Sequence, residues 1–346
     1  MNARAIALAL LSAALFGAAT PASKALLDGL SAFQLAGLLY LGAAMGVAPF
    51  ALREGGLRFP GAGDRRNRLR LAGAIAAGGV AGPVFLLFGL RLADAASVSL
   101  WLNFELAATA LLGALVFREH LGRAGWTGVA AALGGAAALS GFEGIAGASA
   151  ALLVLTACIC WGLDNHLTAL IDGITPSQST FWKGLVAGSI NLALGLLIDP
   201  FHASTGSTAI ALAVGALAYG ASIVLYIHAA QTLGATRAQV VFASAPFFGV
   251  ALSVLLLDED LLVTHGVAAA MFILAIWLLS RDRHSHHHTH DAIEHAHEHR
   301  HDDDHHLHAH EGLAPGVRHA HRHRHDAVAH AHPHWPDLHH RHRHRH

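Results

Sequence analysis

One acidic side chain stands near the middle of a long apolar run. Glu105 lies within VSLWLNFELAATALL, too far from either end of a membrane-spanning helix to reach water along its own length. In that setting a carboxylate can bind a cation or carry a coupling proton. The alternative is a structural hydrogen bond, or an ion pair with Lys24 or Arg91. Trp101 lies one turn earlier on the same helical face, so Glu105 and Trp101 are joint candidates for a binding site.

The chain contains only two lysines, Lys24 and Lys183, against twenty arginines. Both lysines lie within apolar segments, where a charged side chain is costly unless it is paired or hydrated. Each is therefore a candidate for binding an anion or a polar group of a substrate. The alternative is that each ammonium group extends to the nearby helix end to reach water.

A second polar group is formed by the consecutive residues Asp164, Asn165 and His166. Consecutive helical residues fan out over roughly 200°, so the three side chains cannot all face one cavity. Asn165, joined by either Asp164 or His166, is the expected contribution to a site. Aromatic residues either wall a substrate pocket or anchor helices at the membrane interface, and the candidates are Trp101, Trp161, Trp182 and Tyr219.

The last 63 residues, 284–346, hold 25 of the 30 histidines. Imidazole and carboxylate groups at this density offer overlapping ligand sets for Zn²⁺, Ni²⁺, Co²⁺ or Cu²⁺, and the alternative is a low-complexity extension with incidental affinity. No cofactor is expected to be required. This tail has too little apolar surface to fold alone, so it is predicted to be disordered and cytoplasmic. The candidate metal ligands are His286, His287, His288, His295, His297, His299, His305 and His306.

The elements that must position these residues are membrane spans. The chain is 54% hydrophobic and 13% charged with a mean hydropathy of +0.46, whereas soluble domains carry about 25% charged residues. An apolar run of about 20 residues crosses a bilayer as a helix. We therefore predict an all-α membrane protein with ten transmembrane helices, at residues 5–27, 32–52, 71–93, 96–117, 124–141, 149–172, 179–198, 207–230, 237–257 and 262–280. No soluble enzyme chemistry and no phosphate-binding loop are visible, so the chain is not expected to be an enzyme.

The chain repeats itself over roughly 140 residues. LFGAATPASKALLDGLSAFQ (15–34) corresponds to CWGLDNHLTALIDGITPSQ (160–178), and FREHL (117–121) corresponds to LDEDL (257–261). We predict two five-helix repeats, 4–141 and 149–280. Because five is odd, the second repeat is inverted relative to the first, which is typical of secondary transporters.

Arginines set the expected orientation, because basic residues gather on the cytoplasmic side of a membrane. In a ten-span arrangement one side carries Arg4, Arg53, Arg58, Arg65, Arg66, Arg68, Arg70, Arg118, Arg123, Arg237, Arg281 and Arg283. That side is predicted to be cytoplasmic, with both termini inside and Glu259 at the outer face.

Small residues and prolines within the spans predict how the helices pack. Glycine pairs four apart let helix backbones approach closely, and they occur at Gly42/Gly46, Gly78/Gly82 and Gly184/Gly188. A proline inside a span leaves a backbone carbonyl without its helical donor, so neighbours or a polar cavity must supply one. Pro21, Pro83 and Pro246 are such positions.

These features resemble the EamA-type members of the drug/metabolite transporter superfamily over about residues 5–280. The first helix of that family carries an aromatic-Gly pair, a small polar residue and then Lys. Phe16-Gly17, Thr20 and Lys24 match it here, as do Trp161-Gly162 and Asn165, with Ala169 in place of Lys. A basic residue early in the second helix is matched by Lys183 but replaced by Leu39-Tyr40. The Glu that closes the fourth helix is matched by Glu119 and Glu259, while its proline is matched by Pro246 but replaced by Glu105-Leu106.

The resemblance implies a carrier of small organic metabolites, frequently an exporter, that works in the bacterial inner membrane. Alternating access, with Glu105 as the candidate proton-coupling group and the tail as a metal-binding regulator, is the first hypothesis. The alternatives are a carrier of a transition metal or a metal chelate such as a metallophore, and a membrane-anchored metal buffer or sensor. The expected partners are a small-molecule substrate, the lipid bilayer and, at the tail, transition-metal ions, with no nucleic acid. The sequence leaves the oligomeric state open.

Overall fold

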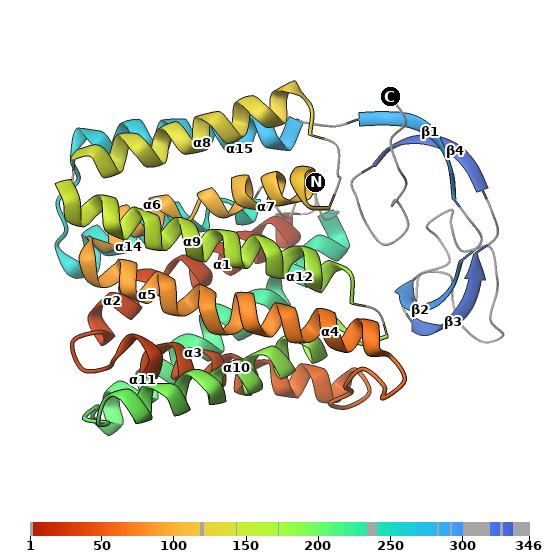
Figure 1. The fold of residues 1–346 in the computed structure, drawn as a ribbon, viewed down its shortest axis with the longest axis horizontal. Helices are drawn as coiled ribbons and strands as arrows, with labels where there is room; N and C mark the ends of the chain where they lie inside the picture. Colours follow the sequence, from red (N-terminus) through yellow and green to blue (C-terminus); the bar gives the residue numbers. More distant parts are fainter. Residues whose placement is uncertain are drawn as a thin grey trace.

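The structure is a computed structural model in which the apolar part of the chain forms a bundle of helices lying alongside one another (Figure 1). It describes residues 3–117, 121–142, 144–171, 173–233 and 241–281, and four strands in the tail. The first repeat contains α1 (Ala3–Gly17), α2 (Ala19–Leu26), α3 (Ala32–Arg53), α4 (Arg65–Ala74), η1 (Ile75–Ala81), α5 (Gly82–Leu92), α6 (Ala95–Trp101), α7 (Phe104–Leu115) and α8 (Arg123–Phe142). The second contains α9 (Gly144–Ala169), α10 (Pro176–Ile198), α11 (Thr205–Val214), η2 (Gly215–Ala221), α12 (Ser222–Leu233), α14 (Ala245–Leu257) and α15 (Val263–Arg281).

Seven helical stretches in the described part of the chain are long and apolar enough to cross a membrane. They are Arg4–Leu26, Ala32–Arg53, Arg65–Leu92, Ala95–Leu115, Ile145–Ala169, Pro176–Ile198 and Thr205–Tyr226, and two shorter apolar helices follow at Ala245–Leu257 and Val263–Leu279. Large apolar side chains point outward, with Ile145 88% and Leu197 82% exposed. An outer surface of this kind suits lipid rather than water. The prediction of an all-helical membrane protein is confirmed; of the predicted span 237–257, α14 covers Ala245–Leu257, and residues 237–240 lie outside the described residues.

The two repeats begin their second helix in the same way. The side chains of Ser31 and Gln34 form a capping box at the start of α3, and those of Thr175 and Gln178 form one at the start of α10. In each box the hydroxyl accepts from the backbone N–H three residues later, and the Gln side chain accepts from the N–H of the capping residue. The Gly-Leu-Ser segment (29–31) and the Gly-Ile-Thr segment (173–175) therefore play the same structural role, because each ends in the residue that caps the second helix of its repeat.

The third helix of each repeat contains a seven-residue π-helical segment. η1 lies between α4 and α5, and η2 lies between α11 and α12. A π segment shifts the hydrogen-bonding register of the backbone, and such segments are frequent at functional sites. The paired positions of η1 and η2 show that this irregularity belongs to the repeat.

Each repeat packs its helices against helices of the other repeat, and the contacts of one repeat have counterparts in the other. α3 packs on α10, and α8 packs on α15, which lie side by side along one edge of the bundle (Figure 1). α9 packs on α5 and α7, while its counterpart α1 packs on α12 and α14. Two repeated domains with these paired contacts imply the inverted repeat that the sequence predicts.

Glycine pairs make the closest of these contacts. A Cβ atom added at Gly184 would lie 2.7 Å from the carbonyl oxygen of Tyr40, and one added at Gly188 would lie 3.0 Å from that of Gly37. One added at Gly46 would lie 2.7 Å from the carbonyl oxygen of Ala216. A side chain at these positions would push the helices apart, so close backbone packing is confirmed at Gly42/Gly46 and Gly184/Gly188.

In the tail, β1 (His284–His290) pairs with β4 (Val328–His334), and β2 (Ile293–His299) pairs with β3 (His319–His325), both antiparallel. Each ladder has two strands. These paired strands differ from the disorder that the composition predicts, although a two-stranded ladder is at best marginally stable by itself in water. The rest of the tail lies outside the described residues.

Candidate functional site

A cavity of about 170 Å³ lies in the middle of the bundle, between helices of both repeats. α1, α3 and α7 of the first repeat and α9, α10 and η2 of the second contribute its charged and aromatic side chains. The lining residues are Phe16, Tyr40, Ala43, Glu105, Trp161, Asp164, Asn165, Thr180, Lys183, Gly184, Tyr219 and Ile223. Five of the residues predicted to form a site or to wall a pocket around Glu105 thus lie on one cavity with it: Trp161, Asp164, Asn165, Lys183 and Tyr219.

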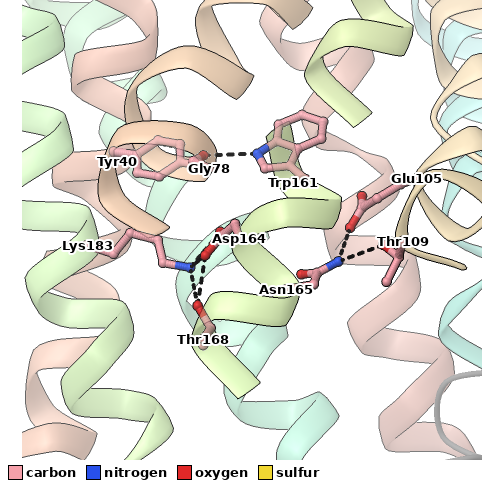
Figure 2. A network of polar contacts seen from close by, with 9 residues as sticks. All are labelled: Tyr40, Gly78, Glu105, Thr109, Trp161, Asp164, Asn165, Thr168 and Lys183. Carbon is pink, nitrogen blue, oxygen red and sulfur yellow. Dashed lines mark hydrogen bonds and ion pairs between the residues drawn. The ribbon is translucent and has the colours of Figure 1, made fainter. Parts of the chain in front are cut away.

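An ion pair occupies one side of the cavity (Figure 2). The ammonium of Lys183 on α10 lies 2.7 Å from both carboxylate oxygens of Asp164 on α9. Thr168, one turn along α9, donates to the same carboxylate at 2.8 Å. The side chains of Lys183 and Asp164 are only 16% and 9% exposed. The two charges therefore neutralise each other in a setting where either alone would be costly.

Glu105 faces the other side of α9 (Figure 2). Asn165 donates to one oxygen of its carboxylate at 3.0 Å and reaches the hydroxyl of Thr109 at 3.4 Å. Neither Lys24 nor Arg91 pairs with it, because both donate to backbone carbonyls elsewhere. Glu105 is thus held by an amide rather than by a cation, and its carboxylate is available to the cavity.

The π segment η1 forms a wall behind these groups. The carbonyl oxygen of Gly78 accepts from the hydroxyl of Tyr40 at 2.6 Å and from the indole N–H of Trp161 at 3.0 Å (Figure 2). Asn191 donates to the next carbonyl, that of Gly79, at 3.1 Å. Pro83 lies five residues after Gly78 and four after Gly79, and it has no N–H that could donate to either carbonyl oxygen. Side chains supply the donors instead, as predicted for Pro83.

Glycine is required at position 78 by the site itself. A Cβ atom there would collide with the carboxylate of Asp164. A Cβ atom at Gly82, one turn on, would lie 2.8 Å from the indole nitrogen of Trp161. The pair Gly78/Gly82 therefore admits side chains of α9 rather than another backbone.

Three predicted site residues lie away from the cavity. Lys24 donates to the carbonyl oxygens of Leu90 and Ala93, both at 2.8 Å, and so caps the end of α5. Trp101 is fully buried in the apolar core. His166 is also buried; one of its ring nitrogens lies 2.9 Å from the carbonyl oxygen of Thr109.

His166 also stacks on Phe117 at 4.3 Å between ring centroids. Because His166 is two residues from Asp164, the two side chains lie about 200° apart around α9. Of the two neighbours considered for Asn165, Asp164 thus lines the cavity and His166 does not. Asp164 and Lys183 stand at similar distances on either side of the short connection between α9 and α10, which places them at the same depth. That spacing is the sequence signal that would have paired them.

The sequence did not single out Phe16, Tyr40 or Thr180 as cavity residues, although each lines it. Phe16 and Tyr40 entered only as matches or mismatches between the repeats. Their role depends on ring contacts that periodicity does not encode. Phe16 meets Tyr219 edge-on at 5.6 Å, and Tyr40 meets Tyr219 at 5.9 Å, between ring centroids.

The remaining predicted residues divide by location. Glu259 lies at the start of α6, where its carboxylate accepts from the N–H groups of Ala95 and Ala96 at 2.8 and 2.7 Å. Its counterpart Glu119 lies outside the described residues, as do His305 and His306. Among the described residues, no three His, Cys, Asp or Glu side chains come together as a metal site. The other tail candidates lie on β1 and β2, where only the backbone is described: His286, His287, His288, His295, His297 and His299.

Comparison with known proteins identifies the family. The sequence model of the EamA-like transporter family matches twice, over residues 3–141 and 148–281. The chain belongs to the EamA-like transporter family. This family is one of membrane transporters rather than enzymes, which agrees with the long apolar helices of the bundle.

Individual relatives are distant. The chain is 27% identical over 218 residues to an uncharacterized transporter of Methanothermobacter thermautotrophicus, covering 58% of this chain and 61% of that protein. It is 25% identical over 223 residues to an uncharacterized transporter of Synechocystis sp., covering 57% and 66%. The chain thus spans less than two thirds of the length of either relative. A crystal structure shares the fold with a TM-score of 0.56 at 16% identity, over 81% of this chain and 99% of that one.

Proposed function

We propose that this chain is a secondary transporter that exports small organic metabolites across the bacterial inner membrane by alternating access. Glu105 is the group that couples export to proton movement. The arginine-rich side and both termini face the cytoplasm. The two repeats, 4–141 and 149–280, enclose the substrate, and the tail from residue 284 is a separate regulatory segment.

The observation that carries the proposal is the environment of Glu105. Its carboxylate lies in a membrane-spanning helix, lines the cavity and is held by the neutral amide of Asn165. A carboxylate in a membrane span is retained at a cost and marks a substrate or proton pathway. An amide can donate to the ionised carboxylate and can turn its own oxygen to accept from the protonated one, so it accommodates both states. A cationic partner would instead hold Glu105 in one state.

Export can be tested in cells. Metabolites released into the medium would be compared between cells that produce the full chain, cells that produce Glu105→Gln and cells without it. Glu105→Gln keeps the shape and the contact with Asn165 but cannot lose a proton. We expect at least one organic metabolite to depend on the full chain and to be lost with Glu105→Gln. Asp28→Asn, at an exposed acid outside the cavity, is the matched control and should export normally.

Coupling requires a second measurement. The exported metabolite would be loaded into proteoliposomes, and its movement measured with and without an imposed pH gradient. Transport by the full chain should accelerate with the gradient, whereas Glu105→Gln should be insensitive to it. Equal acceleration in both proteins would remove Glu105 as the coupling group and leave export itself standing.

For the tail we propose binding of Zn²⁺, Ni²⁺, Co²⁺ or Cu²⁺. Composition supports this, and so does the strand register, because six cross-strand pairs set histidine opposite histidine. Calorimetry with Zn²⁺ and Ni²⁺ would compare the full chain with a chain ending at residue 283. Equal heats from both proteins would place the metal elsewhere and revive a metal or metal-chelate cargo.

A further inference from the structure

The cavity holds one acidic side chain that has no cationic partner among the described lining residues. Among its described lining residues the ionisable acids and bases are Glu105, Asp164 and Lys183. Lys183 is committed to Asp164 through contacts of 2.7 Å to both carboxylate oxygens, and Thr168 adds a third bond to that carboxylate. The pair is neutral as a unit. An ionised Glu105, bonded to a neutral amide, therefore decides the sign of the charge that a ligand meets.

Three of the four aromatic side chains that line the cavity, those of Phe16, Tyr40 and Trp161, offer rings rather than free donors. The hydroxyl of Tyr40 and the indole N–H of Trp161 both donate to the carbonyl oxygen of Gly78, so neither donor is left for a ligand. Phe16 has no polar atom on its side chain, and its ring packs with that of Tyr219. The faces of aromatic rings attract cations, and a desolvated site strengthens that attraction.

The size of the cavity limits what it can hold. Its volume of about 170 Å³ is close to the ~150 Å³ of an engineered protein cavity that binds benzene. A ligand with one ring, or with a short alkyl body of similar bulk, therefore fits. An anionic ligand of this size would meet Glu105 with no unpaired cation among the described lining residues, since Lys183 is already paired with Asp164.

We infer that this cavity selects small organic monocations, such as an aryl- or alkylammonium ion, with the ammonium at Glu105 and the apolar body against Trp161, Tyr40 and Tyr219. The inference rests on the transport function proposed above and names its substrate class. A proton and an ammonium ion compete for the same carboxylate. Binding of the cation to protonated Glu105 therefore releases one proton, which conserves charge in the site and makes the two movements opposite in direction.

Four probes of similar shape and different charge test the class. They are 2-phenylethylammonium, neutral 2-phenylethanol, anionic 3-phenylpropionate and zwitterionic phenylalanine, titrated by calorimetry into the purified full chain near neutral pH. The cation should bind at least about tenfold more tightly than the other three, because only it gains a charge-assisted bond to Glu105. Tighter binding of the zwitterion or the anion would overturn the assignment and would show that Lys183 leaves Asp164 to meet a carboxylate.

Variants test the contribution of the Glu105 carboxylate separately from that of the aromatic ring of Tyr219. Glu105→Gln should lower the affinity for the cation by at least about tenfold and leave that for 2-phenylethanol unchanged. Glu105→Asp keeps the charge and should retain the preference for the cation. Tyr219→Leu should weaken cation binding by about 3- to 30-fold, whereas Tyr219→Phe, which keeps the ring, should not. Equal cation affinity in the full chain and Glu105→Gln would refute the role of this carboxylate.

The proton is counted independently. Repeating the titration with the cation in buffers of different ionisation enthalpy gives the number of protons released per ligand bound. We expect a release that grows as the pH is lowered and that is absent in Glu105→Gln. Binding with no proton release at any pH would contradict competition at Glu105.

The substrate class and the transport function fail in different ways. If the full chain binds the cation in this Glu105-dependent manner but moves no radiolabelled cation in counterflow through proteoliposomes, the class stands and transport falls. If cells export an organic metabolite through the chain while the four probes show no preference for the cation, transport stands and the class is refuted.

Discussion

The ion pair between Lys183 and Asp164 allows a quantitative test of how the cavity is held together. Lys183→Met removes the ammonium and keeps most of the side chain, and Asp164→Leu removes the carboxylate at similar volume. At about 3 Å two unit charges attract by about 5 kcal/mol at an effective dielectric constant near 20, before desolvation is set against it. The two 2.7 Å contacts and the low exposure of both side chains place this pair among buried ion pairs.

Removing one partner of a buried pair typically costs about 3–5 kcal/mol, because the other charge is left uncompensated, whereas replacing both with apolar groups is often close to neutral. Each single variant should therefore lower the free energy of unfolding by about 3 kcal/mol or more. Because Thr168 donates to Asp164, that acid keeps one hydrogen bond without Lys183. We expect Lys183→Met to sit at the lower end of the range, and the double variant to lie within about 1–2 kcal/mol of the parent.

The assay is reversible unfolding in mixed detergent micelles, followed by tryptophan fluorescence for the parent, both single variants and the double variant. Lys24 is the matched control, because it is the only other lysine and donates to backbone carbonyls. Lys24→Met combined with Asp164→Leu should be additive within about 0.5 kcal/mol. A coupling energy for Lys183 and Asp164 no larger than this control would refute the ion pair as a structural element.

Three further predictions follow from single contacts. Gly78→Ala should reduce transport by at least about tenfold, because its Cβ would displace the carboxylate of Asp164; normal transport in proteoliposomes would show that the carboxylate can move aside. Lys24→Met should lower the free energy of unfolding by about 1–3 kcal/mol while transport persists, since it leaves two carbonyls without their donor; loss of transport without loss of stability would instead assign Lys24 to the substrate path. Ser31→Ala should cost about 1 kcal/mol because it removes the helix cap of the first repeat, and Thr175→Ala should cost at least as much, because the Thr175 hydroxyl also donates to Glu54; a smaller loss for Thr175→Ala than for Ser31→Ala in the same unfolding assay would contradict this.

Much of the fold can be read from the sequence because bilayer physics restricts it. Apolar runs of about 20 residues predict spans, and the match between 15–34 and 160–178 predicts the repeat. Glu105 is identifiable for the same reason, since an acid in a membrane span is rare and costly. These inferences use composition and spacing along one helix, which the sequence states directly.

The rest of the site depends on contacts between helices. Lys24 and Lys183 are similar in the sequence, as both lie within two turns of a helix end, yet Lys24 caps α5 and Lys183 pairs across the cavity. The difference lies in which neighbour each helix packs against. The π register of η1 is also hidden, because Pro83 predicts free carbonyls but does not identify their donors. Trp101 illustrates the converse: α6 ends at Trp101 and Glu105 lies on α7, so the break between these helices separates two residues that one continuous helix would place on the same face.

The repeats explain why the two ends of the transport cycle need not be equal in energy. The frame is duplicated, with matching caps and matching π segments. The donors that hold η1 are not, since alignment of the repeats sets Phe16 opposite Trp161 and Gly184 opposite Tyr40. Neither Phe16 nor Gly184 can donate from a side chain. Under the alternating access proposed above, the two repeats swap conformations between the two states of the cycle. The second state would lose the two bonds to Gly78 without gaining equivalent bonds at η2. The conformation described here is then the resting state, and Tyr40→Phe, which removes one donor and keeps the ring, would shift the population away from it.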